Sequence, residues 1–444
     1  MNRRRQALPK TPVTAHIEKL SHDGRGIARI DGKTTFVDGA LASETVMFTY
    51  TKRKSDYDEG RLVSVITPSA HRVEPRCPHY AMCGGCSLQH LNSEMQIIEK
   101  QALLLDVLTR IGHCQPETIM PPLRSAVWHY RNKARLSVRY VEKKQATLVG
   151  FREKNNPRYI TDIHTCLVLN ARVDAEIDVM RQLLDSLDDS KCIAQIEVAA
   201  GDDDVALILR HLTPLSVSDH EKIKAFADKT QFRIFLQPAG PDSVHLFYPK
   251  DVSEFLTYRL PAFDIEYQFH PTDFTQVNSG INREMVSLAI QLLELKTTDV
   301  VLDLFCGLGN FSLPLATQCE RVIAVEGSDT MVRRGEMNAC ANQLKNITFL
   351  CANLEDENAL TDRMCREVTK LLLDPPRTGA LAIVKNLKKV NPQRIVYVSC
   401  NPVTLARDAN ILVHEHGYRL ISAGVMDMFP HTSHVESIAL FVKD

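Results

Sequence analysis

The chain has 444 residues, of which 44% are hydrophobic and 24% are charged, a composition typical of a globular protein with two or three domains. No apolar run approaches the roughly 18 residues of a membrane-spanning helix, and no apolar stretch of a secretory signal follows Met1-Asn2-Arg3-Arg4-Arg5. The twelve cysteines of such a chain favour free thiols and metal ligands over a disulfide framework. We therefore expect a cytoplasmic protein.

The net charge of −1 conceals an asymmetry between two parts of the chain. Residues 1–158 contain 26 Lys and Arg against 15 Asp and Glu, whereas residues 159–444 contain 27 against 39. The N-terminal part is therefore expected to face a polyanion.

Residues 12–70 are predicted to form a small all-β domain, because short strand-like runs alternate with glycine turns such as Asp31-Gly32. The expected strands are Val13–Leu20, Gly26–Ile30, Lys33–Val37, Glu44–Thr51 and Gly60–Ile66. Five strands at this spacing fit a barrel of the OB type, which often binds nucleic acid. The stretch from Ser21 to Ala28 also resembles the TRAM domain, an OB-like RNA-binding module. Its phosphate contacts would come from Lys52-Arg53-Lys54 and Arg61.

Cys77, Cys83 and Cys86 follow with the spacing C-x5-C-x2-C, and two glycines between the last two allow a tight turn. Three thiolates need a fourth ligand to complete a tetrahedral metal site or a 4Fe–4S cluster. Our choice is Cys166, which lies in a polar loop, and Cys114 is the nearer competitor. Structural zinc is the alternative occupant.

A helix is predicted from Ser93 to Gly112, with Ser93 as its N-cap and Gly112 as its stop. We expect core packing and no catalytic role from its apolar residues, which are Ile97, Ile98, Leu104, Leu105, Leu108 and Ile111.

Residues 124–158 form the most basic window of the chain, with ten Lys and Arg against two Glu. Aromatic residues lie between the charges: Trp128, Tyr130, Tyr140 and Phe151. Cations for phosphates and flat rings for unstacked bases are how proteins bind single-stranded RNA. Strand-like alternation would place Arg135 and Arg139 on one face. The alternative is a solvated edge strand protected by its charges.

From Asp299 onward the pattern alternates between buried strands and helices, which predicts a parallel α/β sheet. Gly307 and Gly309 follow the first strand and would let the backbone approach a ligand closely. Polar residues end successive strands: Asp303, Glu326, Asn353, Asp374 and Cys400. Since the carboxyl ends of parallel strands share one edge, these residues are expected to converge, and an acid there can hold the hydroxyls of a ribose.

Cys400 is the candidate nucleophile at this edge. Ile395–Val398 has the pattern of a buried strand, and Asn401-Pro402 stops it at once. A thiol there can attack an electrophile if its pKa is lowered or its proton is taken. The alternative is a buried, inert cysteine.

Several motifs resemble those of RNA uracil-C5 methyltransferases. They are Phe274-Thr-Gln276-Val-Asn278, Phe305-x-Gly307-x-Gly309-Asn310-Phe311, Asp374-Pro-Pro-Arg377, Ser399-Cys400-Asn401-Pro402 and Met428-Phe429-Pro430-His431-Thr432-x-His434-x-Glu436. The TRAM-like domain together with the cysteine spacing resembles the branch of this family that acts on 23S ribosomal RNA.

The resemblance implies an α/β protein with three domains. These are a TRAM domain (12–70), a central α+β iron–sulfur domain (71–265), with helix 93–112 expected to pack on the catalytic domain, and a Rossmann-like methyltransferase domain (266–444). It implies a 4Fe–4S cluster on Cys77, Cys83, Cys86 and Cys166. It also implies S-adenosylmethionine contacts by Gln276, Phe305, Asn310, Glu326, Asn353 and Asp374.

The implied reaction is methylation of C5 of one uridine in 23S ribosomal RNA, with Cys400 adding to C6 and Glu436 removing the C5 proton. The enzyme is expected to be monomeric and not to act on DNA. A DNA cytosine-C5 methyltransferase is the chemical alternative, but Ser399 precedes Cys400 where that class has Pro. Two further hypotheses are the same chemistry on another rRNA or tRNA uridine and a non-catalytic RNA-binding iron–sulfur protein.

Overall fold

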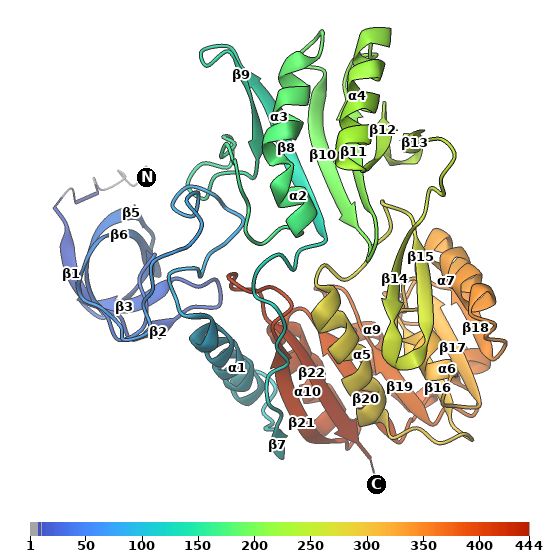
Figure 1. Ribbon diagram of the computed structural model, residues 1–444. Coiled ribbons are helices and arrows are strands. Elements are labelled where there is room, and N and C mark those ends of the chain that lie inside the picture. Colours follow the sequence, from blue (N-terminus) through green and yellow to red (C-terminus); the bar gives the residue numbers. More distant parts are fainter. Residues whose placement is uncertain (1–7, 10, 444) are drawn as a thin grey trace, which may run out of the picture.

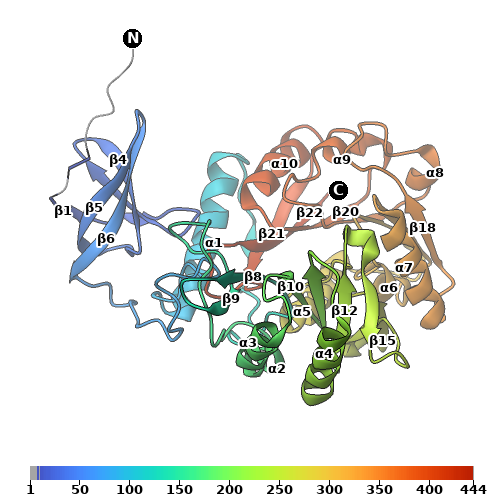
Figure 2. The same cartoon turned by 90° about the horizontal axis from the view of Figure 1, so that it is seen from above.

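The computed structural model describes residues 8–9 and 11–443, so the stretch Met1–Arg5 lies outside the described residues. Three bodies follow one another along the chain: a β-barrel, a domain with helices on one face of a sheet, and a larger α/β domain (Figure 1). Seen from above, helix α1 (Ser93–Arg110) lies between the barrel and the α/β domain (Figure 2).

The N-terminal barrel has six strands in the order β1-β5-β6-β4-β3-β2. They are β1 (Val13–His16), β2 (Lys19–Leu20), β3 (Gly26–Ile30), β4 (Lys33–Asp38), β5 (Thr45–Arg53) and β6 (Tyr57–Thr67). The predicted first strand is thus divided in two. The division falls at Ile17, whose amide donates to Glu44 of the β5 side, while the next amide, of Glu18, donates to Ile27 of β3. The chain changes partners there, which closes the barrel.

The central domain is a six-stranded sheet in the order β13-β12-β11-β10-β8-β9. Its strands are β8 (Lys133–Val141), β9 (Ala146–Gly150), β10 (Ile193–Ala200), β11 (Val205–His211), β12 (Arg233–Gln237) and β13 (His245–Tyr248). One face packs on α2 (Ala171–Ala175), α3 (Ile177–Ser186) and α4 (Val217–Thr230), and these elements share one apolar core. The other face is partly covered, because Ala206, Ile208 and Phe235 on it enter the core of the C-terminal domain. On β8 this face exposes Arg135 and Arg139 together, as predicted.

The C-terminal domain is built on an eight-stranded sheet in the order β18-β17-β16-β19-β20-β22-β21-β7. Its strands are β7 (Thr118–Ile119), β16 (Val300–Leu304), β17 (Arg321–Glu326), β18 (Ile347–Cys351), β19 (Lys370–Leu373), β20 (Arg394–Ser399), β21 (Arg419–Met426) and β22 (Glu436–Val442). Within this sheet, β22 runs antiparallel to both of its neighbours and the other pairs are parallel. The strand order reverses between β16 and β19, the point at which open α/β sheets bind ligands.

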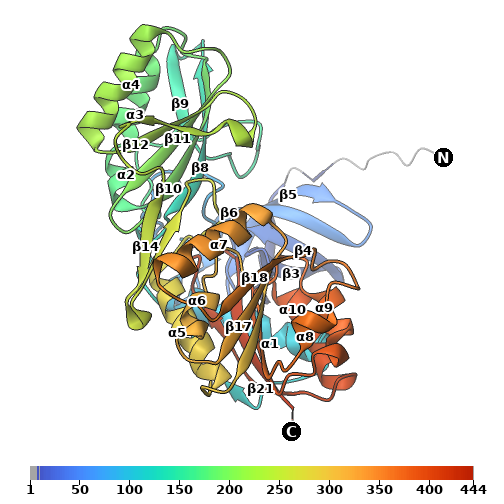
Figure 3. The same cartoon turned by 90° about the vertical axis from the view of Figure 1, so that its right-hand side faces the viewer.

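Helices cover both faces of this sheet (Figure 3). One apolar core lies under α5 (Ser279–Leu293), α6 (Ser312–Ala316) and α7 (Asp329–Ala341). The second lies under α1, α8 (Asp362–Cys365), α9 (Leu381–Lys385) and α10 (Pro402–His414). Short 3-10 turns occupy Pro241–Ser243, Pro261–Phe263 and Leu387–Lys389.

Helix α1 packs against α10 and β21, so it belongs by contact to the C-terminal domain. Its N-cap is Asn92, whose side-chain oxygen accepts from the Glu94 amide at 2.7 Å, and not the predicted Ser93. Two residues of the predicted apolar face, Ile98 and Ile111, are 48% and 39% exposed.

The hairpin of β14 (Leu256–Leu260) and β15 (Ile265–Phe269) contributes its apolar side chains to the core of the C-terminal domain. The expected boundary between residues 265 and 266 would cut this hairpin, so we infer that the C-terminal domain begins before β14. Among the helices that the structure describes, none combines the length and apolarity that a bilayer-crossing segment requires.

Candidate active site

The predicted nucleophile and base lie side by side at the carboxyl edge of the sheet. Strand β22 pairs antiparallel with β20, and Ser399 lies opposite Ser437. The register therefore places Cys400, just past the end of β20, beside Glu436, the first residue of β22. Asn401 then caps α10 by accepting from the Val403 amide at 3.1 Å, and Pro402 occupies the first turn, where no amide is needed.

The Cys400 thiol is half-buried and surrounded mainly by acids. Burial, followed by the nearby carboxyls of Glu436 and Asp374, raises the pKa of Cys400 to about 11, against the Arg377 guanidinium and a backbone hydrogen bond, which favour the thiolate. The thiol is therefore protonated at neutral pH until something changes around it.

Glu436 is half-buried, and its surroundings favour the protonated, uncharged carboxyl. Burial is the largest cause and the Asp374 carboxyl adds to it, so that the pKa of Glu436 rises to about 8. The cations of Arg377 and Lys100 act in the opposite direction. A carboxylate of this basicity is suited to take a proton from carbon, since general bases work best when their pKa lies near the working pH.

Asp374 and Arg377 bracket the loop after β19. Burial alone raises the pKa of Asp374 to about 7. The Arg377 carbonyl accepts from the Asn401 amide at 3.0 Å, which ties this loop to the start of α10. The Arg377 guanidinium approaches Nδ1 of His434 at 3.3 Å, and burial lowers the pKa of His434, so the ring can accept this hydrogen bond.

The loop after β16 has the conformation of a ligand cradle. Phe305, Gly307 and Gly309 all have positive φ, at 64°, 56° and 90°. A Cβ on Gly309 would lie 2.6 Å from the Leu313 side chain, so this position requires glycine. Glu326, at the end of β17, accepts from the Gly307 amide at 3.1 Å and thereby connects two strand ends.

Asp303 sits beneath this loop and is fully buried. One carboxylate oxygen accepts from the Ser312 hydroxyl at 2.5 Å, and the other has no partner. Burial raises the pKa of Asp303 to about 7, and the carboxyls of Asp374 and Glu326 contribute. Four carboxyls (Asp303, Glu326, Asp374 and Glu436) thus gather at one edge, which favours a cationic ligand.

The other residues predicted to bind the cofactor differ in whether their side chains are exposed or already hydrogen-bonded within the protein. The side chain of Asn310 is committed to the protein, because its oxygen accepts from Tyr258 at 2.9 Å and its amide donates to Asn282 at 2.8 Å. Asn353 is exposed and caps its own turn through the Glu355 amide. Gln276 is half-buried and precedes α5.

The four predicted cluster cysteines line one small cavity beside Tyr80 and Phe151. Cys77, Cys83, Cys86 and Cys166 all contribute to it, whereas Cys114 packs against the core under α1 and α10. Within the described part of the chain, however, no three His, Cys, Asp or Glu side chains are arranged to hold a metal ion. The iron–sulfur centre is therefore not shown and stays a prediction.

The basic window contributes to a groove that reaches the active site. It is lined by Arg131, Arg135, Arg152, Lys154 and Phe151, and also by Thr432, Ser433 and His434, which shortly precede Glu436. Lys133 does not belong to this surface. Its ammonium donates to the carbonyls of Pro271 and Asp273, and burial lowers its pKa to about 8.

Sequence reasoning missed Gln96 and Lys100 of α1, which are buried against the stretch from Asp427 to His431. The signal was available, because Lys100 interrupts the apolar row formed by Ile97, Leu104 and Leu108.

The sheet order and the acidic, glycine-lined edge define a Rossmann-like methyltransferase fold. A tRNA (uracil-54, C5)-methyltransferase of Pyrococcus abyssi, solved with S-adenosyl-L-homocysteine, has this fold, with a TM-score of 0.74 over 97% of this chain and 100% of that one, at 24% identity. The family model tRNA (Uracil-5-)-methyltransferase matches residues 92–444, and the TRAM domain model matches residues 11–63.

Relatives of known name are similar over their whole length. The 23S rRNA (uracil(1939)-C(5))-methyltransferase RlmD of Legionella pneumophila (strain Lens) is 60% identical over 99% of this chain and 100% of its own. The protein of that name from Alcanivorax borkumensis is 51% identical over 100% and 99%. The chain belongs to the RNA uracil-C5 methyltransferase family, among relatives named RlmD, which confirms the resemblance drawn from the motifs.

Proposed function

We propose that this protein transfers a methyl group from S-adenosylmethionine to C5 of one uridine in 23S ribosomal RNA, the uridine numbered 1939 in the names of its relatives. The observation that carries the proposal is the pairing of Cys400 and Glu436 across β20 and β22 in a chain 60% identical to such a relative.

In the proposed mechanism Cys400 is the nucleophile and Glu436 is the base. The Cys400 thiol gives up its proton to solvent, and addition of the thiolate to C6 moves the C5–C6 π electrons toward O4 and makes C5 nucleophilic. When bound, S-adenosylmethionine supplies an electrophilic methyl group. Glu436 then takes the proton from C5, the C5–H electrons re-form the double bond, and the Cys400 thiolate leaves. The target base must leave its stack to be reached.

The raised pKa of Cys400 keeps its thiol protonated at neutral pH before the ligands bind. A protonated thiol does not react with stray electrophiles. Arg377, the cation that favours the thiolate, lies on the same loop as Asp374, so binding at this edge can alter the field at the sulfur.

S-adenosylmethionine fits the acidic edge because it carries a sulfonium and an ammonium. We propose that Gln276, Phe305, Asn310, Glu326, Asn353 and Asp374 hold it. The unpartnered oxygen of Asp303 and the close backbone at Gly309 support this assignment. Since the Asn310 side chain is engaged with Asn282 and Tyr258, we assign its contact to the backbone.

We also propose that the cysteine cavity holds a 4Fe–4S cluster, with Cys77, Cys83, Cys86 and Cys166 as its ligands. The support is the chemistry of the donor set: four thiols from two distant stretches of the chain line one cavity. Bound zinc is the alternative outcome of an iron assay.

RNA is proposed to lie along the barrel and the basic groove. A second hollow lies between the barrel and the stretch that contains Cys83 and Cys86. It is lined by Arg25, Lys52 and Arg61 of the barrel and by Ser87 and Lys154. It adjoins the groove that ends at His434, because Ser87 and Lys154 line both.

The test is transfer of a tritiated methyl group to unmodified 23S rRNA, with tRNA and DNA as competing substrates. Wild-type protein should label only the rRNA. Cys400→Ala should give neither methyl transfer nor a covalent adduct, whereas Cys340→Ala, which removes an exposed thiol, is the matched control.

Glu436→Gln separates the two halves of the mechanism. It should transfer the methyl group and then stay bonded to the RNA, as a species that survives denaturing electrophoresis. Labelling of tRNA would show that the substrate is not 23S rRNA alone, and absence of labelling with any RNA would contradict catalysis. Turnover of Glu436→Gln at the wild-type rate would show that another group is the base.

A further inference from the structure

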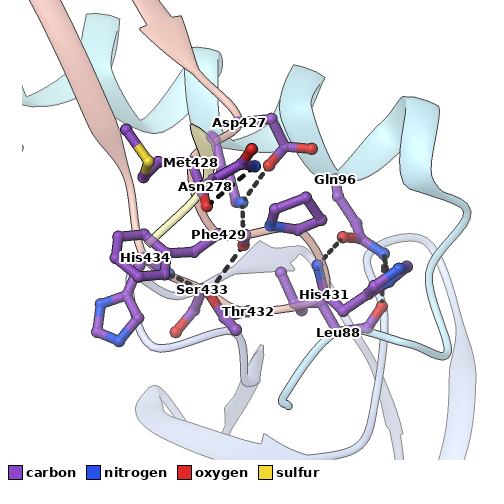
Figure 4. A network of polar contacts seen from close by, with 12 residues as sticks. Leu88, Gln96, Asn278, Asp427, Met428, Phe429, His431, Thr432, Ser433 and His434 are labelled. Carbon is purple, nitrogen blue, oxygen red and sulfur yellow. Dashed lines mark hydrogen bonds and ion pairs between the residues drawn. The ribbon is translucent and has the colours of Figure 1, made fainter. Parts of the chain in front are cut away.

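Helix α1 buries two polar side chains against the stretch that precedes Glu436. Gln96 is fully buried and Lys100 is 3% exposed. Both contact residues 427–435, called here the 427–435 segment, which joins β21 to β22. Figure 4 shows Gln96 directed toward this segment. Burying an ammonium is unfavourable unless it is paired, so this placement calls for an explanation.

Lys100 holds the beginning of the segment. Its ammonium donates to the Asp427 carboxylate at 2.9 Å and to the Phe429 carbonyl at 3.0 Å. Asp427 is 4% exposed, so both charges of the pair are removed from water.

Gln96 holds the middle of the segment, four residues earlier on the same helix. Its side-chain oxygen accepts from the His431 amide at 2.8 Å. Its NH₂ group donates to the carbonyls of Leu88 at 3.0 Å and Leu91 at 2.8 Å. The helix therefore ties the segment to the loop that follows the cysteines.

Other parts of the chain hold the peptide groups in between. The Met428 carbonyl accepts from Asn278, and the Pro430 carbonyl accepts from the Tyr130 hydroxyl at 2.9 Å. The His431 carbonyl accepts from the amides of Ser87 and Leu88, both at 2.9 Å. The segment has no regular structure of its own, so these outside partners hold its course between β21 and β22, while strand pairing fixes the register at Glu436.

Lys100 also acts on Glu436 through its charge. The charged groups that act on Glu436 are Asp374, Arg377 and, from α1, Lys100, and Glu436 in turn acts on Cys400. Among them Arg377 and Lys100 are the cations that lower the pKa of Glu436 against burial and Asp374. Loss of the Lys100 charge would leave the base more often protonated.

We propose that Lys100 is a positioning residue for removal of the C5 proton, because its ammonium anchors the 427–435 segment to α1 and so places the Glu436 carboxylate at the substrate. The proposal rests on the proposed function. If the ion pair only stabilised the fold, its loss would slow every step of the reaction to the same extent. A positioning role instead affects the step that uses Glu436.

Lys100→Met tests this in single turnover with S-adenosylmethionine and substrate RNA. Methyl transfer should stay within about threefold of wild type, while release of the RNA slows about tenfold to a hundredfold, the effect expected when a reacting group is misplaced. The covalent adduct should accumulate. The acid limb of the pH profile for release should move up by about one pH unit, because a cation near the base is lost.

Gln101→Met is the matched control. Gln101 is the next residue of α1 and also bonds to backbone, with Met120 at 3.2 Å and Val425 at 3.3 Å, but it touches β21 and not the segment. Its ratio of adduct to product should equal that of wild type.

A second variant tests the proposal in case Lys100→Met does not fold. Lys100→Met combined with Asp427→Asn leaves no unpaired buried charge, so folding should be retained while the cation is still absent. The double variant should accumulate adduct as the single one does. A wild-type ratio of adduct to product in it, or equal loss of both steps, would overturn the proposal.

The same experiment separates this inference from the function on which it rests. If wild-type protein transfers no methyl group, the proposed function fails. If wild type transfers and Glu436→Gln traps the adduct but neither Lys100 variant does, only the role of Lys100 fails.

Discussion

Glu436→Gln should stabilise the folded protein at alkaline pH while it blocks turnover. Glu436 is half-buried beside Asp374, and its folded pKa is about 8 against an ordinary value of 4.5. Between these two values the unfolded chain has lost the proton that the folded chain retains, so wild-type stability falls as the pH rises through this window. Glutamine carries no such proton, and the variant escapes this loss.

The size of the effect follows from the same two values. Their difference is about 3.5 pH units, and each unit corresponds to about 1.4 kcal/mol, which sets a ceiling of about 5 kcal/mol above pH 8. We expect at least about 2 kcal/mol at pH 8.5. At pH 5 the gain should stay below about 1 kcal/mol, because this pH lies only just above the unfolded pKa.

The assay is urea unfolding at pH 5, 7 and 8.5, followed by the fluorescence of Trp128, the single tryptophan of the chain. This ring stacks on His431 at 3.9 Å between centroids, so it reports on the 427–435 segment. Glu415→Gln, at an exposed acid just after α10, is the matched control and should show no pH-dependent gain. A gain that is equal at all three pH values, or a wild type more stable at pH 8.5, would refute the reasoning.

Two further predictions concern the N-terminal half. Protein purified without oxygen should be brown with about four irons per chain; Cys166→Ser should lose the iron and Cys114→Ser should keep it, and stoichiometric zinc would contradict the cluster. Arg131→Gln with Arg152→Gln should weaken RNA binding and flatten its log–log salt dependence by about 0.7 for each lost phosphate contact. Lys224→Gln on α4 should leave that slope unchanged, and an unaltered slope in the double variant would place the RNA elsewhere.

The secondary structure of the C-terminal domain was predictable because it is local. Each strand is a continuous apolar run, and the residue that ends it is visible in the sequence, so Glu326, Asp374 and Cys400 could be placed at one edge from the rule for parallel sheets alone. Helix ends were less well predicted. Asn92 and Ser93 are both good N-caps, and only the hydrogen bond to Glu94 decides between them.

Domain limits needed the packing of the chain. The hairpin at residues 256–269 follows the central domain in sequence, yet its apolar side chains enter the core of the C-terminal domain. Helix α1 likewise precedes most of the central domain and packs on α10.

The sequence by itself determined the strands, the edge at which they end and the chemical types of the residues there, because periodicity and chain order carry that information. Tertiary structure alone decided what several polar side chains do. Lys133 belonged to a basic window but donates to the Asp273 carbonyl, and the side-chain amide of Asn310 donates to Asn282. Lys100 meets Asp427 across 327 residues of sequence. A polar side chain acts through its partner, and partners so distant in the chain are brought together only by tertiary packing.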